Sequence, residues 1–203
     1  MPQRRLLLAA AAAATLAALT GCDKFAGGKS GASYNAVDIT GATYGQALSL
    51  PDADGRTRTL ADFAGKIVVV FFGFTQCPDV CPGTLAELAA VKKELGADGD
   101  KVQGVFITID PERDTPQVLK GYVTAFDPSF VALRGTLEQT AAVAKDFKVF
   151  YQKVPGKAEG AYTMDHTAGS YVFDTAGKVR LFTRYGTGPK ALTDDIRQLI
   201  QKG

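Results

Sequence analysis

The sequence predicts an α/β sandwich in which helices cover a mixed β-sheet. Residues 67–72, IVVVFF, are continuously apolar and β-branched or aromatic, which is typical of a strand buried on both faces of a sheet. Segments with helical spacing then alternate with segments of strand character, and a hairpin and a closing helix complete the chain. This alternation indicates one α/β domain whose sheet contains both parallel and antiparallel strands.

The first half of the domain contains three predicted elements besides this strand. Residues 47–60 include the turn residues Asp52-Ala53-Asp54-Gly55 and predict an N-terminal hairpin extension. Leu85, Leu88, Val91 and Leu95 have helical spacing, so a helix should follow the central strand. Residues 102–109, VQGVFITI, predict a second central strand.

The second half begins with a helix that Thr115-Pro116 should open, because this is the preferred order of N-cap and first helical residue. Its expected apolar stripe is Val118, Leu119, Tyr122 and Phe126. A short strand at residues 131–133 precedes a capping box at residues 136–139, TLEQ. The helix that this box opens should carry Val143, Phe147 and Phe150.

The last predicted elements are a hairpin and a helix. Residues 170–173 and 179–182 have strand character and flank the turn sequence DTAG at residues 174–177. The closing helix has Pro189 near its start, and Leu192, Ile196 and Leu199 share one of its faces.

The first 21 residues predict export. Arg4 and Arg5 precede LLLAAAAAATLAAL, which has the basic flank and length of a signal peptide and is shorter than the span of about 20 residues that a membrane helix needs. Residues 19–22, LTGC, resemble a bacterial lipobox, which implies cleavage before Cys22 and lipid attachment to its sulfur. An anchor helix and an ordinary cleavage site are the alternatives. Asp23 resembles a signal that retains lipoproteins in the inner membrane.

Residues 22–36 are rich in Gly, Ser and Ala and predict a flexible tether, so residues 37–203 should form one domain. Removal of residues 1–21 would leave 21 basic and 21 acidic residues. This neutral balance, without basic runs, does not support a nucleic-acid partner.

Cys77 and Cys81 lie in the stretch FFGFTQCPDVCPGT directly after the central strand. Pro78 and Pro82 disfavour helical conformation in the residues before them, so both cysteines are expected on the loop. Pro82 would then be the first helical residue. The positive end of the helix would face the thiols and lower their pKa.

Three interpretations of this cysteine pair compete. A structural disulfide would close a minimal loop and stabilise the fold by about 2 kcal/mol or less. Thiol–disulfide exchange suits a strand–loop–helix location, although three residues separate the cysteines where the familiar redox motif has two. A metal site needs a third ligand from elsewhere in the chain.

The only histidine is His166, in YTMDHTAGSYVFD. It follows a long connection rich in Gly, Lys and Pro, residues 153–161, and precedes a predicted strand. A single histidine is more often a surface or hydrogen-bonded residue than a ligand.

Three segments together resemble the signature segments of the Sco/SenC family: GFTQCPDVCP, DPERDTP at residues 110–116 and DHT at residues 165–167. The resemblance extends over residues 48–202. It implies a thioredoxin-like fold with an added strand and helix. It also implies a membrane-anchored copper protein, facing the periplasm or the mitochondrial intermembrane space, that helps to assemble the dinuclear copper centre of cytochrome c oxidase. The family's copper ligands correspond to Cys77, Cys81 and His166.

Two thiolates and an imidazole suit Cu(I), and a further weak ligand would let them hold Cu(II). Structural zinc wants four ligands, and only a carboxylate such as Asp79 or Asp165 would remain for the fourth. Asp165 is also a candidate to orient His166 by a hydrogen bond. The resemblance places Asp110 and Asp114 near the copper site, although an ordinary strand-to-helix turn explains them equally well.

The resemblance implies two kinds of partner: the copper-bearing subunit of a haem–copper oxidase and a thiol reductant protein that keeps Cys77 and Cys81 out of a disulfide. An enzyme alternative remains open, in which the chain is a thiol–disulfide oxidoreductase that reduces the cysteines of that oxidase subunit. Lipid on Cys22 would hold the protein on the periplasmic side of the inner membrane.

Overall fold

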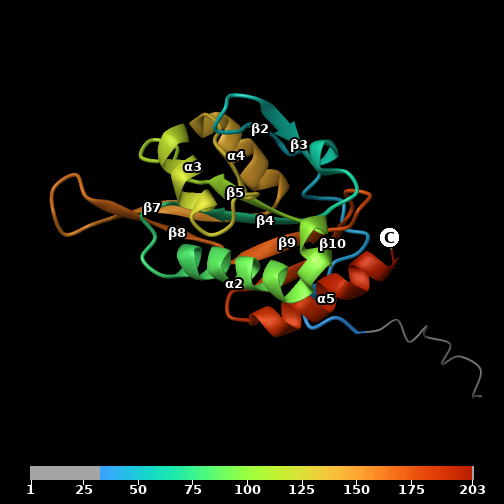
Figure 1. Cartoon of the computed structure of the whole chain (residues 1–203). Coiled ribbons are helices and arrows are strands. Elements are labelled where there is room, and N and C mark those ends of the chain that lie inside the picture. Colours follow the sequence, from blue (N-terminus) through green and yellow to red (C-terminus); the bar gives the residue numbers. More distant parts are fainter. Residues whose placement is uncertain (1–32, 203) are drawn as a thin grey trace, which may run out of the picture. The chain divides into compact units, whose positions relative to one another are not determined.

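A computed structural model describes residues 33–202, so the predicted signal peptide, Cys22 and most of the tether lie outside the described residues. The centre of the domain is a six-stranded mixed sheet with the strand order β1-β10-β9-β4-β5-β6 (Figure 1). Strands β4, β5 and β6 are parallel, while β9 is antiparallel to β4 and β10 is antiparallel to both β9 and β1. The strands are β1 (Val37–Asp38), β4 (Ile67–Gly73), β5 (Val102–Thr108), β6 (Val131–Leu133), β9 (Gly169–Phe173) and β10 (Val179–Arg184).

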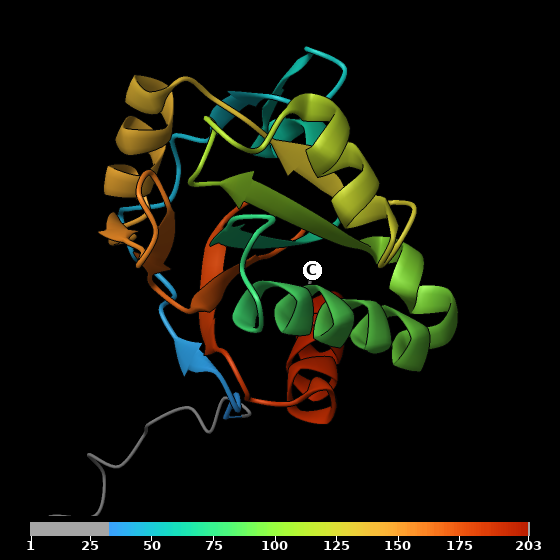
Figure 2. The same ribbon diagram turned by 90° about the vertical axis from the view of Figure 1, so that its left-hand side faces the viewer.

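Helices cover both faces of this sheet, as the predicted sandwich requires. Figures 1 and 2 show α2 and α5 on one face and α3 and α4 on the other. The helices are α2 (Val80–Leu95), α3 (Pro116–Thr124), α4 (Leu137–Asp146) and α5 (Pro189–Lys202), with short 3-10 helices η1 (Leu60–Phe63) and η2 (Gly96–Lys101). The predicted mixed α/β fold is therefore confirmed.

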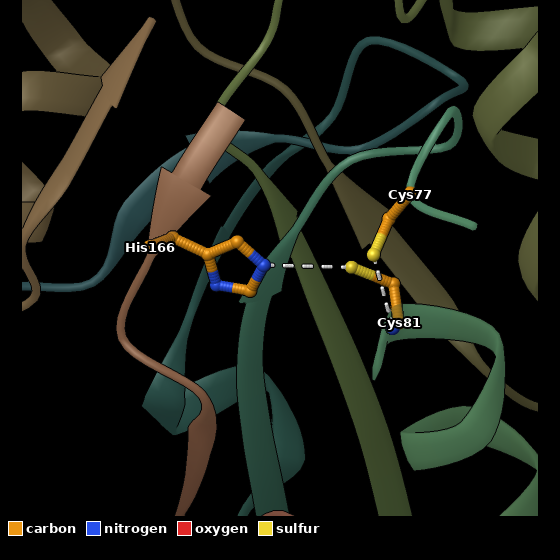
Figure 3. A group of neighbouring side chains, drawn as sticks. All are labelled: Cys77, Cys81 and His166. Carbon is orange, nitrogen blue, oxygen red and sulfur yellow. Dashed lines mark hydrogen bonds between the residues drawn. The ribbon is translucent and has the colours of Figure 1, made fainter. Parts of the chain in front are cut away.

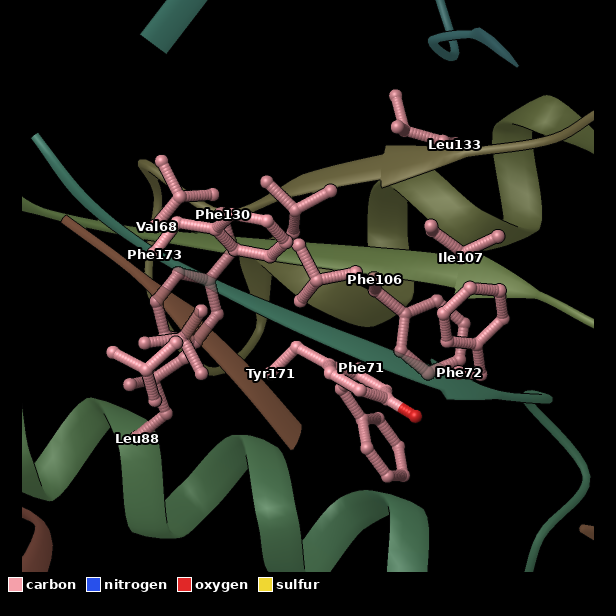
Figure 4. Packing of buried hydrophobic residues seen from close by; sticks show 14 of the residues in the cluster. Val68, Phe71, Phe72, Leu88, Phe106, Ile107, Phe130, Leu133, Tyr171 and Phe173 are labelled. Carbon is pink, nitrogen blue, oxygen red and sulfur yellow. The ribbon is translucent and has the colours of Figure 1, made fainter. Parts of the chain in front are cut away.

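The core forms around β4, in which all seven residues are buried. Its apolar side chains point alternately to the two helical layers because successive side chains of a strand lie on opposite faces of the sheet. Strand β5 on one side and β9 on the other satisfy its backbone. Phe71, Phe72 and Phe106 lie within this packing (Figure 4). The carboxyl end of β4 therefore offers a rigid base for the cysteine loop that follows it.

The predicted helix starts are confirmed in detail. The Thr115 hydroxyl accepts a hydrogen bond from the Val118 amide, and Pro116 is the first residue of α3. Thr136 and Gln139 form the reciprocal capping box at the start of α4. The N-terminal hairpin also forms where the turn residues predicted it, as β2 (Ser49–Pro51) and β3 (Thr57–Thr59).

Two expectations about the helix surfaces are wrong. Helix α4 ends at Asp146, and Lys148 takes a left-handed conformation with φ +56°, so Phe150 lies outside the helix and is 56% exposed. Val118 is 47% exposed on α3 because the buried face of this short helix is narrower than the predicted stripe and is centred on Leu119 and Val123.

The connection predicted at residues 153–161 is instead the end of strand β7 and the turn of a further hairpin. Strands β7 (Tyr151–Pro155) and β8 (Tyr162–His166) form their own two-stranded antiparallel sheet, and Tyr151 pairs with His166. Most of its side chains are exposed or half-buried, so the apolar alternation that marks a strand is weak. We call this element the histidine hairpin.

Asn35 and Ala36, just before the predicted domain boundary at residue 37, are hydrogen-bonded to the last helix. The backbone N–H groups of Asn35 and Ala36 both donate to the buried carboxylate of Asp195 in α5, at 2.8 Å each. Within residues 33–202, every helix is too short or too polar to cross a membrane.

Candidate metal centre

The two cysteines occupy different kinds of structure. Cys77 lies on the loop after β4, whereas Cys81 is the second residue of α2, which begins at Val80. The prediction that Cys81 lies outside the helix is therefore wrong. Pro82 is the third helical residue, where its missing N–H has no intrahelical partner in any case, so the helix tolerates it.

Cys81 is fully buried, while Cys77 is half-buried. They do not form a disulfide, and the Cys81 amide donates to the Cys77 sulfur at 3.4 Å. Burial raises the pKa of the Cys81 thiol, and the nearby Cys77 and Asp114 act in the same direction. The expected lowering is wrong for Cys81 because the loss of hydration around a thiolate outweighs the field of the helix start.

His166 is the last residue of β8 and points toward Cys81 (Figure 3). Its Nε2 atom lies 3.6 Å from the Cys81 sulfur, and its Nδ1 atom lies 3.0 Å from the Thr167 carbonyl oxygen. A carbonyl only accepts hydrogen bonds, so Nδ1 carries the proton and Nε2 presents a lone pair to the cysteines. Burial lowers the pKa of His166, which favours the neutral imidazole that metals bind.

Two aromatic rings form a wall beside this imidazole. Phe71 and Phe74 are buried, and their ring centroids lie 5.9 and 6.1 Å from the centroid of His166 in edge-on geometry. Both rings restrict the tilt of the histidine and keep water from its inner side. Phe71 is buried, as its place in the predicted central strand requires, and the structure adds the contact of both rings with His166.

One ligand atom from each of Cys77, Cys81 and His166 lies within 4.8 Å of the other two. Among the described residues these three are the only group of this kind, and no carboxylate belongs to it. The predicted fourth-ligand candidates are turned elsewhere or exposed: Asp79 is 3.3 Å from the Tyr185 hydroxyl, and Asp165 is a surface residue. The set therefore suits a metal that accepts three ligands.

The structure also locates the residues expected to support the site. The Thr167 carbonyl, and not Asp165, accepts the hydrogen bond from the second ring nitrogen of His166. Asp114 is buried and accepts hydrogen bonds from the hydroxyls of Thr75 at 2.5 Å and Thr108 at 2.6 Å, and burial raises its pKa. Asp110 is buried and accepts from the hydroxyl of Tyr162 on the histidine hairpin at 2.9 Å. Neither aspartate belongs to the ligand group.

Sequence reasoning missed Gln76, Arg113 and Tyr162. Their side chains meet beside the cysteine loop, where Arg113 Nη1 donates to the Gln76 side-chain oxygen at 3.0 Å and to the Tyr162 carbonyl at 2.9 Å. The signal was present in the unusual density of charge at residues 110–114, DPERD, but the partners of these charges are distant in sequence.

The fold and the site define a class of protein: an α/β domain that presents two cysteines and a histidine as one metal-binding set at the end of its central strand. The sequence pattern of the SCO1/SenC family matches residues 37–201, and the chain belongs to this family. The resemblance to Sco/SenC proteins is thereby confirmed.

Several relatives show the extent of this similarity. The bovine mitochondrial protein SCO2 homolog is 39% identical over 156 residues, which cover 74% of this chain and 58% of the relative. A SCO2-like protein of Rickettsia felis is 35% identical over 151 residues, 74% of either chain. The copper-bound structure of Bradyrhizobium japonicum ScoI is 39% identical, covers 75% of this chain and 96% of that one, and superimposes with a TM-score of 0.68. This chain spans about three fifths of the length of the mammalian relatives.

Proposed function

We propose that this protein is a copper metallochaperone that binds copper through Cys77, Cys81 and His166. The observation that carries the proposal is the convergence of two sulfurs and one imidazole nitrogen within 4.8 Å. Soft thiolates favour Cu(I), and a site with three ligands is complete for Cu(I) but incomplete for structural zinc. The copper-bound state of the similar Bradyrhizobium japonicum ScoI supports this choice of metal.

The burial of Cys81 suits a cargo site. Its thiol is neutral without metal, so binding of copper must displace the proton, and the empty site does not bury an uncompensated charge. His166 approaches from a separate hairpin, and Cys77 is half-buried on a loop. A receiving protein would therefore meet Cys77 and His166 first and would replace these two ligands before the buried one.

The proposed recipient is the copper-bearing subunit of cytochrome c oxidase, at the periplasmic face of the membrane. Membership of the SCO1/SenC family supports this recipient. The LTGC sequence supports a lipid anchor on Cys22, and Asp23 supports the inner membrane. A disulfide of another protein would accept two electrons and two protons from the Cys77 and Cys81 thiols, and the Cys77–Cys81 disulfide formed in this way would not bind copper. A thiol reductant protein would reduce this disulfide back to the dithiol and would itself be oxidised to a disulfide.

The test measures Cu(I) binding by the purified, reduced protein in competition with a Cu(I) chelator, with absorption spectra after Cu(II) is added. We expect one copper per chain, thiolate-to-Cu(II) bands, and marked weakening in Cys77→Ser and His166→Ala. Cys22→Ser is the matched control, because it removes a cysteine that is not a proposed ligand. It should bind copper normally and lose membrane attachment. Copper binding no tighter than that of Cys77→Ser would refute the metallochaperone function.

A second candidate function is thiol–disulfide exchange with the cysteines of the same oxidase subunit. The contact between the Cys81 amide and the Cys77 sulfur favours it, because it holds the two side chains close enough to react with one another. The half-buried Cys77 would attack a disulfide of the subunit and release one of its cysteines as a thiolate. Cys81 would then attack Cys77 in the mixed disulfide, release the second cysteine of the subunit and leave a Cys77–Cys81 disulfide. His166→Ala separates the two functions: exchange requires only the sulfurs, whereas tight copper binding requires the imidazole.

A further inference from the structure

The acidic turn between β5 and α3, residues 110–114, contacts both halves of the candidate metal site. On one side, Asp114 accepts from the hydroxyl and amide of Thr75, and Arg113 donates to Gln76, the residue before Cys77. These contacts hold the start of the cysteine loop against the end of β5.

On the other side, three charged or polar residues of the turn contact the histidine hairpin. Asp110 accepts from the Tyr162 hydroxyl, Glu112 forms an ion pair with Lys153, and Arg113 donates to the Tyr162 carbonyl at 2.9 Å. Within residues 33–202 the hairpin has no ladder with the six-stranded sheet, so these polar contacts hold its position together with the packing of Met164 in the core.

Arg113 is the one side chain of this turn with hydrogen bonds to both the cysteine loop and the hairpin. Its guanidinium also lies over the Tyr162 ring, 3.7 Å from the centroid, and is paired with the buried carboxylate of Asp110. Among the described residues its Nη2 atom is buried and has no hydrogen-bond partner. Burial of such a donor is costly, so the remaining contacts must outweigh this loss.

We propose that Arg113 is a positioning residue that sets the distance between the cysteine loop and His166. It touches no ligand atom and acts through Gln76 and Tyr162. The planar guanidinium donates in several directions from one rigid group and stacks on an aromatic ring, and a lysine cannot reproduce both. The effect on copper affinity rests on the proposed function, whereas the effect on the hairpin does not.

The first experiment measures hydrogen exchange of the copper-free protein. In Arg113→Ala, amides of residues 151–154 and 162–166 should exchange at least about tenfold faster than in the wild type, the scale of one lost charge-assisted hydrogen bond. Arg58→Ala is the matched control: its side chain is equally exposed, at 21%, and pairs with buried Asp52 in the β2–β3 hairpin, away from the cysteine loop and the histidine hairpin in its contacts. Unchanged exchange in the histidine hairpin of Arg113→Ala would overturn the proposal.

The second experiment is a double-mutant cycle on Cu(I) affinity. Arg113→Ala should weaken binding by about tenfold, but should have no further effect in a His166→Ala background, because it acts through the position of His166. An equal loss in both backgrounds would show that Arg113 acts by another route. If the wild type binds no copper, the proposed function fails and hydrogen exchange alone decides the role of Arg113.

Arg113→Ala leaves the Asp110 carboxylate buried without its cation, so a milder variant protects the test against misfolding. Arg113→Lys keeps a cation beside Asp110 but cannot donate to the Gln76 side chain and to the Tyr162 carbonyl from one planar group. We expect faster hairpin exchange in this variant too, by a smaller factor. If Arg113→Ala fails to fold, unchanged exchange in Arg113→Lys would overturn the proposal.

Discussion

Gly73, the last residue of β4, is where the core and the candidate metal site are most tightly linked. A Cβ atom at this position would lie 2.8 Å from the Cys81 sulfur, 2.8 Å from the Phe71 ring and 2.9 Å from the Phe106 ring. Ordinary contacts begin near 3.4 Å, so the methyl group of Gly73→Ala requires shifts of about 0.6 Å in its neighbours. Phe71 and Phe106 are buried in the core and have little room to move.

We expect Gly73→Ala to lower the free energy of unfolding by about 1–3 kcal/mol, the usual cost of an added methylene in a packed core. It should also displace the Cys81 sulfur relative to His166 and weaken Cu(I) binding. Gly121→Ala is the control, because Gly121 lies inside α3 and a Cβ atom there meets nothing within 4 Å. That variant should gain roughly 1 kcal/mol from helix propensity and bind copper normally.

Urea unfolding followed by circular dichroism, together with chelator competition, measures both effects. The reasoning fails if Gly73→Ala is as stable as the wild type and binds Cu(I) equally well. Lower stability with unchanged affinity would mean that the Phe rings, and not the sulfur, absorb the displacement.

Three further predictions concern the cysteines and the stability of the domain. Because burial raises the pKa of Cys81, alkylation of Cys81 in the Cys77→Ser variant should be slow at pH 7. Its rate, measured by mass spectrometry, should keep rising about tenfold per pH unit beyond pH 9, where the rate of an ordinary thiol reaches a plateau. A plateau below pH 9 would contradict this. Asp195→Ala removes the acceptor of three hydrogen bonds from Asn35 and Ala36, so it should lower the free energy of unfolding by about 1.5–3 kcal/mol and speed proteolysis before β1. Unchanged cleavage would show that these bonds do not hold the segment. Thr136→Ala removes the N-cap of α4 and should lower the free energy of unfolding, measured in urea, by about 1 kcal/mol. An unchanged free energy of unfolding would mean that water replaces the hydroxyl.

The parts of the fold that the sequence predicted well are those with a strong local signal. The apolar run of β4 and the Thr-Pro and TLEQ helix starts depend on neighbouring residues alone, and all three formed as expected. The histidine hairpin was missed because all but one of the side chains of its strands are exposed or half-buried, so the sequence resembles a polar loop.

The site was predictable in its membership but not in its environment. Local proline preferences predicted Cys81 on the loop. In the structure α2 begins at Val80, two residues before Pro82, and therefore includes Cys81. The pKa of Cys81 depends on burial beneath residues from other elements, which no local pattern reports. The contacts of Arg113 join segments up to 49 residues apart, so only the folded chain brings them together.

The separate sheet of the histidine hairpin has a consequence for how such a site changes over evolution. Cys81 belongs to the packed core, so substitutions around it are paid in stability. The hairpin has its own two-stranded ladder and only one buried side chain, Met164, so its tip and the positions without contacts to residues 110–114 can vary while the six-stranded sheet keeps its hydrogen bonds. A lineage can therefore gain, retune or discard the imidazole ligand without rebuilding the domain, and the thiol pair that remains is still suited to redox chemistry.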